Sequence, residues 1–251
     1  MMTEKIDKYK VQAALVRSFF DAFSHGVIES QMEDRNEKTT PQSVKKLMLE
    51  HYEHIAPAFF DTMFFPLAAM NYKYEDIAAL AREAQQRGDD MMALVRTACG
   101  DEAYYNAMVE EYKRNFSMLL AGRYLSNADH LEGYVRKAKE ETEASVDSDR
   151  AIELTVRVVM FAYVRGLRQT GEGARFDRSA HLRQVHPLRG ATLFRLMLDA
   201  MNILLLDEAV DFADAEAADL ASLFLKVCQT QHNFTVMTNE MDRTYSELMK
   251  E

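Results

Sequence analysis

Proline and glycine are scarce in this sequence, with four Pro and nine Gly among 251 residues. Both residues interrupt regular helices, whereas the chain is rich in Ala, Leu, Met and Glu, which lose little freedom in a helix. The hydrophobic fraction is 48% and the charged fraction is 28%, as in a globular rather than a disordered chain. The composition alone therefore favours a folded, helical protein.

Cysteine is also nearly absent. Cys99 and Cys228 stand alone, without the spacing of a zinc site, and two distant thiols form no disulfide framework. The first ten residues carry several charges, so they contain no signal-peptide core, and the later apolar runs are too short to span a membrane. These absences predict a cytoplasmic protein without a membrane span.

Apolar residues recur at helical spacing through most of the chain. They form a stripe from Ile6 to Phe23, and we expect Gly26 to end this helix before a polar loop over residues 28–39. Pro57 and Pro66 are expected to bracket a short, apolar buried segment that forms one or two helical turns rather than a strand. Later helices are expected at about 74–87, 89–99, 101–121, 126–143 and 147–166, with glycine after several of them.

The predicted fold class is all-α, a multi-helix bundle of about eight to ten helices with a long C-terminal helical hairpin. We expect an N-terminal helical bundle over residues 1–165, an Arg-rich connector over 166–190 and the hairpin over 191–251, packed with the bundle as one domain. Gly171, Gly173 and Pro187 mark the connector, where the helical pattern is weakest. No repeat of fixed period is apparent.

The second arm of the predicted hairpin carries an apolar seam. No Gly or Pro follows Gly190, and the spacing predicts one continuous helix from about Asp214 to Lys250 with a coiled-coil pattern. The predicted oligomer seam consists of Leu220, Phe224, Val227, Phe234, Met241, Tyr245 and Leu248. We expect this seam to pair with a second copy, which predicts a homodimer or another homo-oligomer.

Arginine is concentrated between residues 165 and 195, where seven Arg face two acidic residues and no Lys, in an acidic protein of net charge −10. Arginine suits bidentate recognition of carboxylate or phosphate, which predicts a site for an anionic ligand or an acidic partner. The alternative is a solvated loop that pairs with the chain's own acidic residues. The overall charge argues against nucleic acid. The predicted ligand or partner residues are Arg165, Arg168, Arg175, Arg178, Arg183, His186 and Arg189.

Residues 186–192 read His-Pro-Leu-Arg-Gly-Ala-Thr. This stretch resembles the phosphoacceptor region of histidine-phosphotransfer domains, where His is followed by Leu, a basic residue, Gly and a small residue. The resemblance implies histidine phosphotransfer through His186, with Arg189 offsetting the phosphoryl charge. The alternative is an ordinary loop-to-helix junction, with Pro187 near the start of the helix.

A metal site has one weak candidate, formed by Glu50, His51 and His54. On one helix, residues three or four positions apart lie on the same face and could share a metal. The alternative is that His51 is an ordinary core histidine. Carboxylate-bridged di-iron bundles use Glu-x-x-His, which the sequence lacks. No cofactor is identified by these residues.

No catalytic motif of a hydrolase, P-loop protein or zinc protease occurs. The leading prediction is therefore a non-enzymatic helical regulatory or adaptor protein that acts through protein–protein interaction. The alternative is a helical sensor or enzyme that holds a small molecule, haem or a lipid. The 16 Met and 14 Phe could line such a site, although at helical spacing they also suit an ordinary core.

Overall fold

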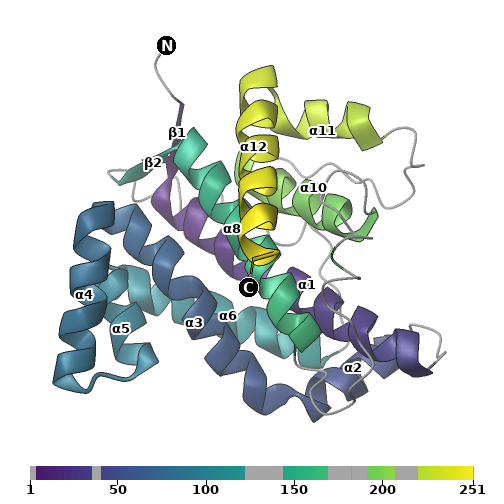
Figure 1. Ribbon diagram of the computed structural model, residues 1–251, viewed down its shortest axis with the longest axis horizontal. Coiled ribbons are helices and arrows are strands. Elements are labelled where there is room, and N and C mark those ends of the chain that lie inside the picture. The colour runs from purple at the N-terminus through teal and green to yellow at the C-terminus, as the bar shows by residue number, and fades with distance from the viewer. Residues whose placement is uncertain are drawn as a thin grey trace.

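The computed structural model describes residues 4–35, 41–121, 144–168, 182, 191–206 and 220–250. Within these ranges the chain forms ten helices and one antiparallel ribbon with two strands of three residues each (Figure 1). The predicted all-α class is confirmed. None of the helices in these ranges is long and apolar enough to cross a membrane.

The elements divide between the two halves of the chain. The first half contains β1 (Lys5–Asp7), α1 (Lys8–Arg35), α2 (Pro41–Glu50), α3 (Tyr52–Asn71), α4 (Tyr74–Arg87), α5 (Met91–Ala98) and α6 (Glu102–Leu120). The second half contains β2 (Ser145–Asp147), α8 (Ser148–Arg168), α10 (Ala191–Leu205), α11 (Leu220–Cys228) and α12 (Gln231–Leu248).

The helix ends predicted at Gly88 and Gly100 are confirmed. Their φ angles are 76° and 72°, in the left-handed region that glycine adopts without strain. Directly after Gly100, the Asp101 carboxylate accepts the backbone N–H of Ala103 at 2.6 Å and so caps the start of α6. Local backbone conformation and capping are therefore sufficient to end one helix and begin the next at these positions.

The prediction that Gly26 ends the first helix is wrong, and so is the loop predicted from residue 28, because α1 continues to Arg35. Gly26 instead lies where α1 crosses α8, facing Gly166. A Cβ on Gly26 would lie 2.9 Å from the backbone N of Leu167 and closer still to the carbonyl oxygen of Tyr163. Both glycines therefore allow the two helix backbones to touch, and α1 and α8 form the buried centre of the protein.

The segment between Pro57 and Pro66 is helical and largely buried as predicted, but the prolines do not bound it, since both lie inside α3. Each proline removes one backbone hydrogen bond from the helix. Phe59 and Met63, between the two prolines, are fully buried in the core. Their burial offsets the lost backbone bonds and keeps α3 continuous.

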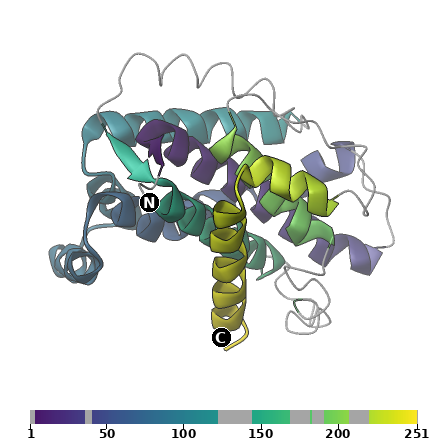
Figure 2. The same ribbon diagram turned by 90° about the horizontal axis from the view of Figure 1, so that it is seen from above.

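The arm predicted as one C-terminal helix is two helices. Gln229, with φ of 64°, ends α11, and the Thr230 hydroxyl caps α12 by accepting the N–H of Asn233 at 3.1 Å. Figure 2 shows the two helices diverging sharply from this junction. The apolar pattern continues through the break because both helices cover the same core, with α11 on α10 and α12 on α8.

The two halves of the chain repeat one arrangement. Strands β1 and β2 pair with each other, Ile6 opposite Val146, and each leads directly into one of the two crossing helices. In each half, a later helix among the described residues packs on the crossing helix of the other half, since α3 packs on α8 and α10 packs on α1. Helices α6 and α12 instead pack on the crossing helix of their own half, α6 on α1 and α12 on α8.

Identical residues support this correspondence. The matched pairs in the strands and crossing helices are Asp7 and Asp147, Val16 and Val156, Arg17 and Arg157, Ala22 and Ala162, and Gly26 and Gly166. Both α3 and α10 contain Leu-x-Ala-Met-Asn, at residues 67–71 and 198–202. The junctions before α6 and α12 both consist of a buried Cys, a residue of positive φ and an N-cap, at 99–101 and 228–230.

Helices α6 and α12 carry the same polar cluster, Glu-x-x-Arg followed by Asn or Thr. In α6, Asn115 donates to the Glu111 carboxylate at 2.9 Å, and in α12 Thr244 donates to Glu240 at 3.1 Å. The interval between matched residues shortens along the chain because the connecting segments differ in length. The chain is therefore built from two related halves, although no fixed period is visible in its sequence.

Candidate functional site

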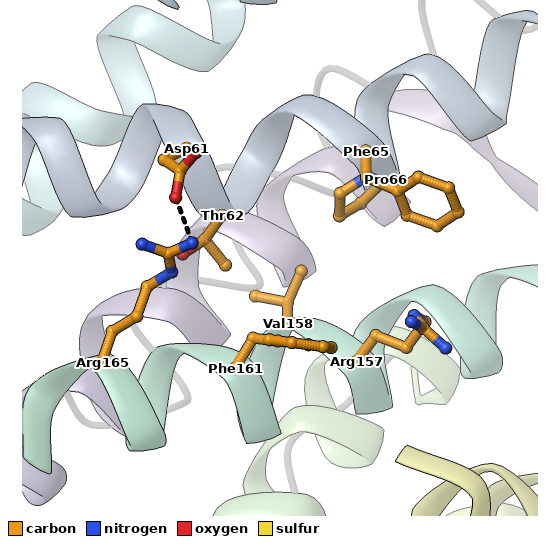
Figure 3. A pocket seen from close by; sticks show the side chains of 8 residues that line it. All are labelled: Asp61, Thr62, Phe65, Pro66, Arg157, Val158, Phe161 and Arg165. Atoms are coloured by element: carbon orange, nitrogen blue, oxygen red, sulfur yellow. Dashed lines mark ion pairs between the residues drawn. The ribbon is translucent and has the colours of Figure 1, made fainter. Parts of the chain in front are cut away.

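A pocket of about 160 Å³ lies where the two halves meet, between α3 and α8 (Figure 3). We refer to it as the α3–α8 pocket. Helix α3 supplies one wall and α8 the other. The lining residues are Asp61, Thr62, Phe65 and Pro66 from α3, and Arg157, Val158, Phe161 and Arg165 from α8.

The middle of the α3–α8 pocket is apolar. Val158 lies at its base, 1% exposed, next to the half-buried ring of Phe161 on α8 and across from the half-buried ring of Phe65 on α3 (Figure 3). The hydroxyl of Thr62 donates to the Ala58 carbonyl of its own helix at 2.7 Å, so its methyl group is the part left for the pocket. A cavity of about 150 Å³ with apolar walls holds one benzene ring. The α3–α8 pocket is therefore large enough for a single ring.

One end of the pocket is closed by an ion pair between Asp61 of α3 and Arg165 of α8 (Figure 3). The two side chains are 44% and 31% exposed, so both groups are accessible to solvent and to a ligand. Exposed pairs of this kind contribute about 0–1 kcal/mol to stability. The pair therefore forms a closure that can open at low energetic cost.

The other end is formed by Arg157, whose guanidinium lies 5.6 Å from the centre of the Phe65 ring and 5.5 Å from that of Phe161. It pairs with Glu240 at 3.1 Å and Glu247 at 2.7 Å, both on α12. Burial lowers the pKa of Arg157, but the hydrogen bonds and charges of the two glutamates outweigh that effect and raise the pKa above its usual value. Arg157 therefore stays charged and joins the pocket to α12.

The other half of the chain does not repeat this chemistry. Alignment of the crossing helices by their shared Arg and Gly places Asp21 of α1 at the position of Phe161, and His25 at the position of Arg165. Arg17 there pairs with Asp21 of its own helix, at 2.8 Å. The two halves thus agree at the helix crossing and at Arg17 and Arg157, but differ at the positions of Phe161 and Arg165, which line the pocket.

Of the Arg-rich connector, the structure describes only residues 166–168 and 182. Arg165 lines the pocket, and Arg168 lies at the exposed end of α8. Arg175, Arg178, Arg183, His186 and Arg189 lie outside the described residues. The anion site over the whole connector, and phosphotransfer through His186, both stay predictions.

The predicted oligomer seam is largely inside the chain. Phe224, Val227, Met241 and Leu248 are buried, and Phe234 and Tyr245 are half-buried. The side chain of Leu220 is outside the described part of the structure. These buried residues pack against their own chain, which leaves them little surface to offer to a second copy.

The residues proposed for a metal do not share one helix. Glu50 ends α2, His51 lies between the helices, and His54 belongs to α3. The two imidazole rings are 6.2 Å apart, and the Glu50 carboxylate lies 3.9 Å from the Lys46 ammonium. Across the described ranges, no three His, Cys, Asp or Glu side chains are grouped so that they could hold a metal ion.

Both cysteines are buried at matched junctions between helices. Burial raises the pKa of Cys99 and of Cys228 to about 12. Since the thiolate rather than the thiol is the nucleophile, neither side chain is activated for covalent chemistry. Their positions indicate that both are core residues.

Of the residues that line the pocket, the sequence pattern predicted a functional role only for Arg165. A signal was present on α8, where Arg157, Phe161 and Arg165 are spaced four apart and so share one helix face. The partners on α3 had no such signal, because the pairing of α3 with α8 depends on the tertiary fold.

No protein-family model, curated protein or solved structure matches this chain. The geometry itself therefore defines the class: an all-α protein of two related halves, with a ring-sized pocket at their interface.

Proposed function

We propose that this protein is a helical regulatory protein that binds a small organic molecule in the α3–α8 pocket. The observation that carries the proposal is the combination of a ring-sized apolar space with charged groups at both ends. Ligand sites are typically apolar clefts with a few well-placed polar groups. The matched position on α1 lacks this chemistry, which supports a specialised role for the α8 side.

Arg157 provides a route from the pocket to the rest of the protein. Its guanidinium contacts two lining rings and also pairs with Glu240 and Glu247 of α12. A ligand that favours one position of Arg157 would favour the matching position of α12, because binding stabilises whichever conformation it contacts better. We propose that α12 reports occupancy of the pocket to a partner protein, the output expected of an adaptor.

Indole provides a direct test, since it supplies an uncharged ring system of about the required size. We expect indole to bind the wild-type protein. Its affinity for the Val158→Phe variant should be at least ten-fold lower, because the added ring occupies the base of the pocket. Saturation-transfer NMR and a titration would measure this loss. The matched control is Leu225→Phe, at a side chain that is 47% exposed and not in the pocket lining.

Circular dichroism would establish that Val158→Phe is folded. Phe161→Trp, at a half-buried lining position, offers a second and gentler way to narrow the same space. Equal binding of indole to wild type and to both folded pocket variants would contradict the proposal. Loss of binding in the pocket variants but not in Leu225→Phe would support it.

Self-association through the C-terminal seam is a separate hypothesis, and the burial of Phe224 and Met241 within one chain argues against it. Sedimentation at several protein concentrations tests it directly. A mass that rises with concentration, and falls to that of a monomer in Tyr245→Ala, would support the seam. A constant monomer mass would exclude it.

A further inference from the structure

We propose that the ligand of the α3–α8 pocket is a free amino acid with a compact aromatic side chain, its carboxylate bound by Arg165 and its ammonium by Asp61. This inference rests on the proposed function and names the class of ligand that the same pocket binds. Its basis is the placement of one acid and one base, from different helices, side by side at the edge of an apolar space (Figure 3).

A zwitterion is the chemical complement of the Asp61–Arg165 pair. The guanidinium of Arg165 can hold a carboxylate through two parallel hydrogen bonds, and the carboxylate of Asp61 can accept from an ammonium group. The α-carbon of an amino acid carries these two groups next to each other. Bound in this way, the ligand replaces one exposed ion pair with two charge-assisted contacts.

The charges of the pocket disfavour ligands of a single charge. A simple anion attracted by Arg165 meets the negative charge of Asp61, and a simple cation meets the reverse. Arg157 does not restore the balance for an anion, because Glu240 and Glu247 already pair with it. A ligand with both charges on one carbon avoids repulsion at either group.

The apolar space selects the side chain. Phe65 of α3 and Phe161 of α8 contribute aromatic rings to the pocket lining, in a volume suited to one ring. Arg157 lies beyond both rings, where a guanidinium attracts the face of an additional aromatic group. An aromatic side chain therefore gains contacts along the full length of the pocket, and an aliphatic one gains fewer.

Three probes with the same ring separate the contributions of the two charges. L-phenylalanine carries both groups, 3-phenylpropanoate lacks the ammonium and phenethylamine lacks the carboxylate. We expect L-phenylalanine to bind at least ten-fold more tightly than either of the others, as measured by isothermal titration calorimetry. In Asp61→Asn this preference over 3-phenylpropanoate should fall, because the amide no longer attracts the ammonium group.

Arg165→Gln should lower the affinity for L-phenylalanine at least ten-fold and leave the affinity for phenethylamine almost unchanged. Its matched control is His25→Gln, at the equivalent position of α1, which should leave all three affinities as in wild type. Asp61 and Arg165 are exposed enough for both variants to fold, and a thermal unfolding curve checks this.

The outcomes distinguish this inference from the function on which it depends. If 3-phenylpropanoate or phenethylamine binds as tightly as L-phenylalanine, the amino acid is the wrong ligand class, while the pocket remains a binding site. If indole binds and L-phenylalanine does not, the same conclusion follows. If neither indole nor any of the three probes binds, the proposed function itself is overturned.

Discussion

Replacing Gly26 with alanine is expected to lower the free energy of unfolding by about 3 kcal/mol or more, because the new methyl group enters a direct contact between two backbones. The atoms it would meet are the carbonyl oxygen of Tyr163 and the backbone N of Leu167, the latter at 2.9 Å. Backbone atoms of a buried helix cannot rotate away as a side chain can. The crossing of α1 and α8 must therefore widen, and the surrounding core must loosen with it.

Urea unfolding followed by circular dichroism would measure this loss. Gly88→Ala is the matched control, since Gly88 has positive φ but no atom within 4 Å of an added Cβ. That variant should lose only about 1–2 kcal/mol, the cost of holding alanine in the left-handed region. If Gly26→Ala is no more destabilising than Gly88→Ala, the close crossing is not a major constraint on the fold.

The related halves add a second expectation at the same crossing. Gly166→Ala should cost about as much as Gly26→Ala, because a Cβ there meets the carbonyl oxygen of Phe23 and lies 2.9 Å from Val27 N. The double variant should cost less than the sum of the two, since the first methyl group already separates the helices. An additive double variant would show that the glycines act at independent contacts.

The glycines also show which features of this fold can be predicted from local sequence and which cannot. Gly88 and Gly100 end helices for local reasons, and helix-terminating glycine is visible in the pattern. Gly26 and Gly166 have the same identity but serve a contact between residues far apart in the chain. Nothing in the local pattern separates the two uses, so Gly26 was expected to end a helix that in fact continues.

The prediction that the C-terminal seam joins two copies has a similar limitation, because it also rests on a local pattern. Apolar spacing indicated four residues of α11 and α12 that are buried, namely Phe224, Val227, Met241 and Leu248, but it missed others such as Met237 and Glu240. The pattern does not say whether the covering surface belongs to the same chain or to a second copy. It also continued through Gln229, where positive φ breaks the helix without a glycine to announce it. The burial was predictable, but neither the covering surface nor the break was.

Comparison of the two related halves indicates which residues serve packing and which serve the pocket. Where the halves retain the same residues, as at Gly26 and Gly166, the shared requirement is packing. Where they differ, as at Asp21 and Phe161, one helix neutralises its own arginine and the other leaves an aromatic ring beside an open space. A fold built twice needs its core in both halves, whereas a binding site is needed in only one. The difference between the halves therefore points to the α8 side as the functional one.

Replacing Glu240 with alanine is expected to lower the free energy of unfolding by about 3–5 kcal/mol, because it leaves charges without their buried partner. The Glu240 side chain is 3% exposed and pairs with Arg157 at 3.1 Å and with Arg243 at 2.6 Å. It also accepts the hydroxyl of Thr244 at 3.1 Å. Arg157 is itself only 17% exposed, so water cannot fully replace the lost carboxylate.

Glu247→Ala is the matched control, because Glu247 also pairs with Arg157, at 2.7 Å, but is 43% exposed. Its loss should cost at most about 1 kcal/mol, as for other exposed pairs. Chemical unfolding of the two variants compares burial directly, since both remove one carboxylate from the same arginine. Equal losses would mean that the buried position of Glu240 carries no special weight. A much larger loss for Glu240→Ala would show that its buried carboxylate, which contacts Arg157, Arg243 and Thr244, stabilises the protein more than the exposed pair does, as expected if the contact between α12 and Arg157 is to transmit ligand binding.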